Sequence, residues 1–386
     1  MVLDGPMRRY RFDQRLLALP LVIGLWLAGC GPAHTSAPVQ PAPSQLTYLG
    51  QAQIPFGTAF GGTVIGGLSA ISYDPGRQQY YVLSDDRSER NPARFYTVRM
   101  SLSNNGVSDL TVTDTHPLLD QSGRPFPPLA SDRTPPEVPP DPEGIAFDPA
   151  RQRLYWSSEG ERLIDGPVLL DPWVRTAGLD GSYLGEFALP TNLRMSLQKS
   201  GPRRNRTLEG LTLTPDGKSL FAAMEDPGFN DGPDSDGDRP VLTRFTKFDV
   251  AAQGATAQYA YPIEPAASPA DRNGVSDLVA LSDSSFLVLE RSDSAPPVVR
   301  IFRADIGAAT DVLPMPSMAG AALTPIKKTL AIDLSKTLGA DGSEPLANME
   351  GITLGPKLPD GRQSVVLVSD NDFSPARVTQ FVLLAM

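Results

Sequence analysis

The sequence predicts an all-β chain that folds as a single β-propeller of five or six blades, in which the N-terminal strand closes the C-terminal blade. Three observations predict this fold. A hairpin pattern repeats five times, long helical periodicity is missing, and a strand without a partner precedes the first hairpin while the last blade is one strand short. All three concern residues 46–386, which we expect to form the propeller.

The repeated unit is a short apolar strand, a turn and a second apolar strand. The turns contain Asp-Pro, Pro-Asp-Gly or Ser-Asp-Ser, which favour a reversal of the chain. The units recur at intervals of roughly 65 to 75 residues, which leaves room for two further strands in each blade. The first strands with their turns span 67–77, 142–151, 208–218, 275–285 and 349–361, and the second strands span 80–84, 154–158, 220–224, 286–290 and 365–369.

The composition argues against a two-domain α/β fold. The chain has 39 prolines and 34 glycines, which would break most helices, and the segments between the strands lack a helical period. Residues 46–54 are predicted as a strand with no partner before it, and the last blade, which ends in 378–384, is one strand short. We therefore expect the first strand to complete the last blade. A sixth blade could lie in the irregular segment 298–334, so five and six blades both remain open.

The first 45 residues indicate export and attachment to lipid. Four arginines precede an apolar run, 16–28, which is shorter than the roughly 20 residues of a membrane helix and is typical of a cleaved signal. The run ends in Leu27-Ala28-Gly29-Cys30, which resembles a bacterial lipobox. We therefore predict that 1–29 is a signal peptide and that Cys30, the single cysteine, carries lipid. Residues 30–45, rich in Pro, Ala and Ser, would form a flexible tether.

The residue after the cysteine and the net charge indicate where the protein acts. Gly31 stands where an aspartate would favour the inner membrane, so we expect an anchor in the outer membrane, facing the periplasm. The segment before Cys30 carries four arginines and two aspartates, so its removal takes the formal net charge from -10 to -12. Such an acidic protein is not expected to bind nucleic acid but is suited to cations. We expect it to be a monomer.

Carboxylates recur at one end of the predicted hairpins. Residues equidistant from a turn pair across an antiparallel ladder, so we expect Glu143 opposite Glu159 and Glu209 opposite Glu225. Around a propeller axis, such acids would gather on one rim beside the central channel. The candidate metal ligands are Asp85, Glu143, Glu159, Glu209, Glu225, Asp277, Glu290, Glu350 and Asp370.

Seven short motifs accompany these strands in order along the chain. They are Leu83–Arg87, Asp141–Ala146, Ser157–Gly160, Arg206–Leu211, Leu289–Arg291, Met349–Ile352 and Leu367–Phe373. In this order they are similar to the motifs of phytase-like proteins, a family described by an "esterase-like activity of phytase". The resemblance implies an exported β-propeller, distantly related to calcium-dependent propeller phytases, and leaves the reaction to be inferred from the site.

Two interpretations of the acidic rim remain open. Clustered carboxylates without histidine or cysteine are hard oxygen ligands, which suit calcium better than magnesium. Alternatively, the acids face a water-filled channel, glycine lets the inner strands approach the axis, and Arg87, Arg206 and Arg291 neutralise the charge. In the second case the repeated Glu-Gly pair belongs to the fold alone.

Other catalytic chemistries lack their residues. The two histidines, His34 and His116, lie in the tether and near a proline-rich segment, and the sequence has no Gly-x-Ser-x-Gly elbow or zinc-binding spacing. One hypothesis is a divalent-cation-dependent hydrolase of phosphoesters or other esters, with Arg87, Arg206 and Arg291 binding a small anionic substrate. The other is a non-enzymatic propeller that binds a ligand or a protein at the cell envelope.

The lipid anchor can be tested by replacing its cysteine. Cys30→Ala should move the protein from the membrane fraction to the aqueous fraction, because lipid supplies the only membrane affinity that the sequence indicates. Fractionation of cells expressing either form measures the change. Persistence of the variant in the membrane fraction would contradict the lipobox interpretation, unless a protein partner holds the chain there.

Overall fold

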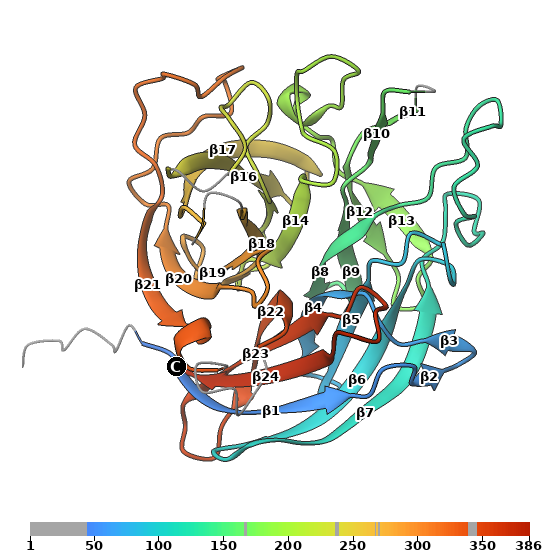
Figure 1. Ribbon diagram of the computed structural model, residues 1–386, viewed down its shortest axis with the longest axis vertical. Helices are drawn as coiled ribbons and strands as arrows, with labels where there is room; N and C mark the ends of the chain where they lie inside the picture. Colours follow the sequence, from blue (N-terminus) through green and yellow to red (C-terminus); the bar gives the residue numbers. More distant parts are fainter. Residues whose placement is uncertain (1–44, 166–167, 236–238, 267, 269–270, 339–345) are drawn as a thin grey trace, which may run out of the picture. The chain divides into compact units, whose positions relative to one another are not determined.

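The computed structural model describes residues 45–386, apart from 166–167, 236–238, 267, 269–270 and 339–345. Within these residues, five antiparallel sheets of four strands each surround a central channel (Figure 1). The predicted all-β propeller is confirmed. Among the described residues, no helix is long and apolar enough to cross a bilayer. Cys30 and most of the predicted tether lie outside them, so the signal peptide and the lipid anchor stay predictions.

Each blade starts with a strand at the channel and ends with a strand at the outer edge. The innermost strands are β4 (Leu68–Asp74), β8 (Pro142–Asp148), β14 (Leu208–Leu213), β18 (Asn273–Ala280) and β22 (Asn348–Lys357). The second strands are β5 (Gln79–Ser84), β9 (Arg153–Ser158), β15 (Ser219–Met224), β19 (Ser285–Ser292) and β23 (Gln363–Asp370). The third strands are β6 (Arg94–Ser103), β12 (Trp173–Ala177), β16 (Val241–Asp249), β20 (Val299–Asp305) and β24 (Thr379–Ala385). The outermost strands are β7 (Gly106–Pro117), β13 (Tyr183–Glu186), β17 (Gly254–Ile263), β21 (Lys327–Asp333) and β1 (Thr47–Ile54).

Short elements fill the connections between these strands. Two hairpins, β2 (Ala59–Phe60) with β3 (Thr63–Val64) and β10 (Glu161–Leu163) with β11 (Val168–Leu170), stand outside the blades. Two 3-10 turns, η1 (Thr191–Leu193) and η2 (Leu334–Lys336), follow β13 and β21. None of these elements contributes a strand to a blade.

The core is divided into apolar layers between neighbouring blades. Alternate side chains of each blade face the blade before it and the blade after it, because the side-chain period of a strand is two. Between blades 1 and 2, for example, Tyr81 and Phe95 pack in one cluster with Phe147 and Trp156. Similar buried clusters lie at the other four blade interfaces. Burial of each large apolar side chain stabilises the ring by about 1.5–3 kcal/mol.

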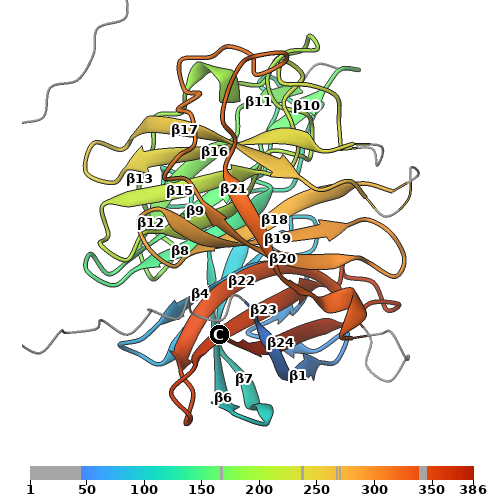
Figure 2. The ribbon, with the colours of Figure 1, turned by 90° about the vertical axis from the view of Figure 1, so that its left-hand side faces the viewer.

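The N-terminal strand closes the ring, as the sequence predicts. Blade 5 has the strand order β22-β23-β24-β1, and β1 pairs with β24 from Thr47 opposite Ala385 to Ile54 opposite Thr379. Figures 1 and 2 both show β1, in blue, beside β24, in red. This antiparallel pairing ties the two ends of the propeller together.

The irregular segment 298–334 does not form a sixth blade. Its two ends are β20 and β21, the outer strands of blade 4. Between them the chain crosses to blade 3, where the backbone N–H groups of Val312 and Ile326 donate to carbonyls of Gln258 and Ala260. The segment therefore covers an existing blade edge and leaves five blades in the ring.

A β-bulge interrupts the innermost strand of every blade at the same height. In blade 2, Pro142 pairs with Ser158 but Ile145 pairs with Trp156, so one extra residue is inserted at Glu143-Gly144. The same shift occurs at Ser69, at Glu209-Gly210, at Ser276 and at Glu350. The expected direct pairing of Glu143 with Glu159 and of Glu209 with Glu225 is therefore wrong. Both members still end on the same rim, because the bulge shifts the ladder by one residue only.

Glycine at the bulge lets neighbouring inner strands touch. A Cβ on Gly210 would lie 2.8 Å from the Cα of Asp277, and one on Gly351 would lie 2.9 Å from the Cα of Ala70. A Cβ on Gly144 would lie 2.6 Å from the carbonyl oxygen of Glu209. The Glu-Gly repeat is thus required by the crowded axis of the ring, and it fixes where the glutamates stand.

The close approach can be tested at the last inner strand. Gly351→Ala should lower the free energy of unfolding by about 1–3 kcal/mol, because the added methyl group has no room between blades 5 and 1. Urea unfolding measures the change. Gly254→Ala is the matched control, since its nearest neighbour outside the adjacent residues would be 3.9 Å away. Equal stability of the two variants would contradict the crowding argument.

Candidate functional site

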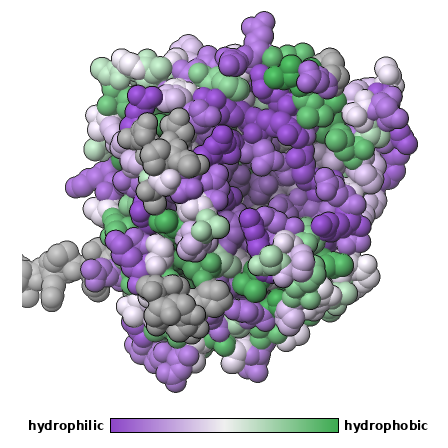
Figure 3. All heavy atoms as spheres, in the orientation of Figure 1, coloured by the Kyte–Doolittle hydropathy of each residue, from purple (hydrophilic) through white to green (hydrophobic). Residues whose placement is uncertain are grey.

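A cavity of about 620 Å³ opens at the end of the channel where the inner strands begin and the second strands end. Its wall contains residues of all five blades, because each blade presents its bulge and the end of its second strand there. Figure 3 shows this region as a hollow of hydrophilic residues at the centre of the face. The polar rim predicted from the sequence is therefore present.

The structure brings most of the predicted carboxylates into this region. Six of them line the cavity, namely Asp85, Glu143, Glu209, Glu225, Glu350 and Asp370. Glu159 lies beside them, fully buried, with an oxygen within 4.8 Å of oxygens of Glu209 and Glu225. The other two predicted ligands, Asp277 and Glu290, are not part of the cavity wall.

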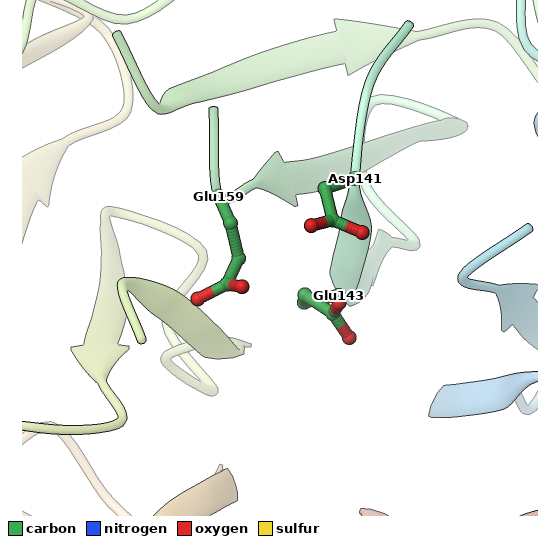
Figure 4. Close-up of side chains that lie close together, drawn as sticks. All are labelled: Asp141, Glu143 and Glu159. Atoms are coloured by element: carbon green, nitrogen blue, oxygen red, sulfur yellow. The ribbon is translucent and has the colours of Figure 1, made fainter. Parts of the chain in front are cut away.

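Two groups of carboxylates are close enough to share one ion. Oxygens of Asp141, Glu143 and Glu159 lie within 4.8 Å of one another, as do oxygens of Glu159, Glu209 and Glu225 (Figure 4 shows the first group). Asp141 was not among the predicted ligands, although it immediately precedes β8 and hence the acidic rim. Its position before the strand is the signal that could have identified it.

Blade 4 has no Glu-Gly pair at its bulge, which explains why Asp277 and Glu290 do not line the cavity as predicted. Its bulge residue is Ser276, so Asp277 takes the place of the glycines Gly210 and Gly351 in neighbouring blades. On the second strand Arg291, opposite Gly274, takes the place that Asp370 occupies opposite Asn348. The prediction matched the blades by the positions of their carboxylates. In the structure, equivalent residues are those at the same distance from the bulge.

Asp277 and Glu290 instead bind other groups of the protein. The Asp277 carboxylate accepts hydrogen bonds from the backbone N–H groups of Leu211, Leu278 and Ile352, at 3.2, 2.8 and 2.8 Å. Glu290 is buried between blades 3 and 4. It accepts hydrogen bonds from the Tyr261 hydroxyl at 2.7 Å and from the Asn273 amide at 2.8 Å, and it pairs with Lys328.

Arginines line one side of the cavity. Arg206 and Arg291, both predicted, belong to its wall, and Arg272 and Arg377 join them from loops. The Arg291 Nη2 atom lies 2.7 Å from Glu350 Oε1 and 3.9 Å from Glu225 Oε1. The third predicted arginine, Arg87, does not line the cavity.

Arg87 is instead held by two acids behind the wall. Its guanidinium lies 2.5 Å from Glu161 Oε2 and 3.3 Å from Asp141 Oδ2. Arg204 binds the other oxygen of Glu161, also at 2.5 Å. These ion pairs fix Asp141 at the edge of the first carboxylate group. They also occupy the Arg87 guanidinium, which therefore does not face the cavity.

Burial and mutual repulsion raise the pKa values of the clustered acids. Burial is the main cause for Glu143, Glu159 and Glu209, whose pKa values lie well above the ordinary value, and neighbouring carboxylates add to the effect. Burial, followed by repulsion from Asp141, raises the pKa of Asp85 to about 8. The pKa of Asp141 rises to about 6, again mainly through burial, with Arg87 opposing the rise.

Two oxygens of the cluster have no hydrogen-bond partner among the described residues, Glu159 Oε2 and Glu350 Oε2. The other oxygen of Glu159 accepts a hydrogen bond from the Thr207 backbone N–H. An unpaired buried carboxylate oxygen is costly. A bound cation would compensate that cost, and both close groups offer only oxygen ligands, which suit a hard divalent ion.

Comparison with known proteins places the chain in a family. No curated protein sequence matches it. Solved structures that resemble it include a periplasmic gluconolactonase of Pseudomonas aeruginosa, with 11% identity, a TM-score of 0.34 and coverage of 84% of this chain and 86% of that one. An α-L-arabinofuranosidase of Lactobacillus brevis has 11% identity, a TM-score of 0.43 and coverage of 83% and 91%. The family model described as "Esterase-like activity of phytase" matches residues 63–373, so the chain belongs to the phytase-like family.

Proposed function

We propose that the cavity binds a calcium ion among Glu159, Glu209 and Glu225, and that the protein hydrolyses phosphoesters or other anionic esters with it. The observation that carries this proposal is the packing of buried carboxylate oxygens within 4.8 Å of one another around Glu159, one of whose oxygens lacks a partner. Calcium–oxygen distances are about 2.3–2.6 Å, so two ligands of one ion are at most about 5 Å apart. The groups have this spacing.

Several features favour calcium over other ions. The two groups contain neither histidine nor cysteine, which zinc and the later transition metals prefer. Calcium accepts six to eight oxygens in flexible geometry, whereas magnesium requires a near-octahedral site and retains its waters. The two close groups supply carboxylate oxygens from blades 2 and 3, which suits an ion that accepts many oxygens.

Arginines stand among the acids of the cavity wall, which supports an anionic substrate. Acids line the wall from blades 1, 2, 3 and 5, whereas Arg272 and Arg291 line the side of blade 4. Arg206 stands between them, with Nη1 3.9 Å from Glu225 Oε2. A guanidinium binds phosphate or carboxylate by paired hydrogen bonds. A substrate anion on the arginine side would therefore lie next to a cation on the acidic side.

Different residues of the cavity would have different roles in hydrolysis. A bound divalent cation supplies polarisation of an ester oxygen and a lower pKa for a water molecule. Arg272 and Arg291 would orient the substrate anion. Asp85, whose pKa of about 8 lies near neutrality, lines the same cavity and would exchange the proton that the leaving group requires. Among the described residues no histidine lines the cavity, so a carboxyl group is the natural proton carrier.

We also propose that the propeller acts at the cell envelope, attached through lipid on Cys30 by its tether. The sequence of residues 1–45 supports this location.

Calcium binding predicts a stabilisation that one substitution should weaken. Calcium should raise the thermal midpoint, since a ligand at one hundred times its dissociation constant stabilises the folded state by about 2.7 kcal/mol. Glu209→Gln keeps the size of the side chain but removes one charge. It should reduce the calcium response and hydrolysis, yet leave the calcium-free protein equally or slightly more stable, because repulsion is relieved. Thermal unfolding with calcium or a chelator measures both effects.

Asp360→Asn is the matched control, because Asp360 pairs with Arg362 in an exposed turn, and this variant should respond like the wild type. A midpoint indifferent to calcium would contradict the cation site. Stabilisation by calcium without hydrolysis of any compound in a phosphoester panel would reject only the catalytic part. It would favour a propeller that binds an anionic ligand beside a structural ion.

The raised pKa values predict opposite pH trends with and without calcium. In the calcium-free protein the folded state retains carboxyl protons that the unfolded chain has lost, so its stability should fall as the pH rises from about 5 to about 8. The calcium-induced increase of the midpoint should grow over the same range, because calcium displaces those protons. Thermal unfolding across the range measures both trends. A calcium response that shrinks with rising pH would be inconsistent with carboxylate ligands of raised pKa.

A further inference from the structure

Asp277 lies on the innermost strand of blade 4, and its carboxylate connects three blades. One oxygen accepts from the backbone N–H of Leu211 in blade 3 and of Leu278 in blade 4. The other oxygen accepts from the backbone N–H of Ile352 in blade 5, at 2.8 Å. The residue is 3% exposed, so water does not compete for these bonds.

These bonds occupy a place where the sheet offers no acceptor. The innermost strand of a blade has an open edge toward the channel, and its N–H groups need partners from outside the ladder. Elsewhere hydroxyl groups of neighbouring blades supply them: Ser72 accepts from the Phe147 N–H, and Thr212 accepts from the Ala280 N–H. For the N–H groups of Leu211, Leu278 and Ile352 the acceptor is the Asp277 carboxylate.

Two of the bonded N–H groups, those of Leu211 and Ile352, lie close in sequence to glutamates of the cavity wall. Leu211 follows Glu209 by two residues and Ile352 follows Glu350 by two residues, and in both strands the bulge lies between them. Holding Leu211 and Ile352 therefore fixes the far side of the bulges that direct both glutamates into the cavity. A Cβ on Gly210 would lie 2.8 Å from the Asp277 Cα, so the strands leave little freedom at this point.

We propose that Asp277 is a positioning residue of the cation site: it fixes the bulges of β14 and β22, and thereby the ligand Glu209 and the neighbouring cavity-wall carboxylate of Glu350. This inference rests on the proposed function. In the neighbouring blades 3 and 5 glycine stands at the equivalent position, and in blade 1 alanine, Ala70, so among the described strands blade 4 alone has a polar side chain there. Asp277 itself does not line the cavity, so its effect on an ion is exerted through Glu209 and Glu350.

Asp277→Asn tests the proposal in the full-length protein. The amide keeps the volume but presents N–H groups to backbone donors, so at least one of the three bonds is lost. We expect calcium, titrated by calorimetry well below the thermal midpoint, to bind about ten- to a hundredfold more weakly, as for other residues that orient metal ligands.

Glu290→Gln is the matched control. Glu290 is a fully buried acid of the same blade that pairs with Lys328 away from the cavity, so its loss should lower stability without changing calcium affinity. This comparison separates positioning from a general loss of stability. Wild-type affinity in folded Asp277→Asn would overturn the proposal, and so would an equal loss of affinity in both variants.

A measurement on the wild type covers the case in which Asp277→Asn does not fold. If Asp277 couples the bulges to the ion, calcium should slow amide hydrogen exchange at Leu211 and Ile352, because coupling between two events is reciprocal. Unchanged exchange at both amides in calcium-saturated protein would overturn the proposal. Absence of calcium binding by the wild type would instead overturn the proposed function, and this inference with it.

Discussion

The contact of five inner strands around one axis is the constraint on which the rest of the molecule depends. Backbones can touch there only where side chains are absent, so Gly144 and Gly210 stand at the contact. The extra residue of each bulge turns the preceding side chain toward the channel mouth. In blades 2, 3 and 5 that side chain is a glutamate. Crowding at the axis and charge at the rim are therefore two results of one local geometry.

The same geometry places like charges in a setting with little water, and the blades balance them unequally. Arg291 replaces an acid in blade 4 and binds Glu350, so the charge of blade 5 is partly neutralised. Glu159 and Glu209 have no arginine within ion-pair distance among the described residues, and their pKa values are raised. The charges of Glu159 and Glu209 are therefore the ones that a bound cation or protons would have to neutralise.

The sequence was sufficient to predict the architecture because every hairpin carries its own pattern of strand and turn. The ring closure followed from the unpaired strand 46–54 and from a last blade that is one strand short. The blade number did not, since the loop between β20 and β21 has turns but no pattern of its own. The location of the acids was predicted in part: Glu143, Glu209 and Glu350 line the cavity, whereas Asp277 and Glu290 do not. A bulge shifts the ladder by one residue. By backbone register Ser276-Asp277 corresponds to Glu350-Gly351, whereas an alignment on carboxylates sets Asp277 against Glu350.

The pairing of β1 with β24 has a consequence for how the chain acquires its structure. The final blade needs residues from both termini, Thr47 opposite Ala385, so the ring cannot be completed before the last strand has been synthesised. Contacts between such distant residues form slowly, because a long loop must close first. Until then β24 has an open edge that other chains could join. A chain that crosses a membrane before it folds would thus bring both termini together only on the far side.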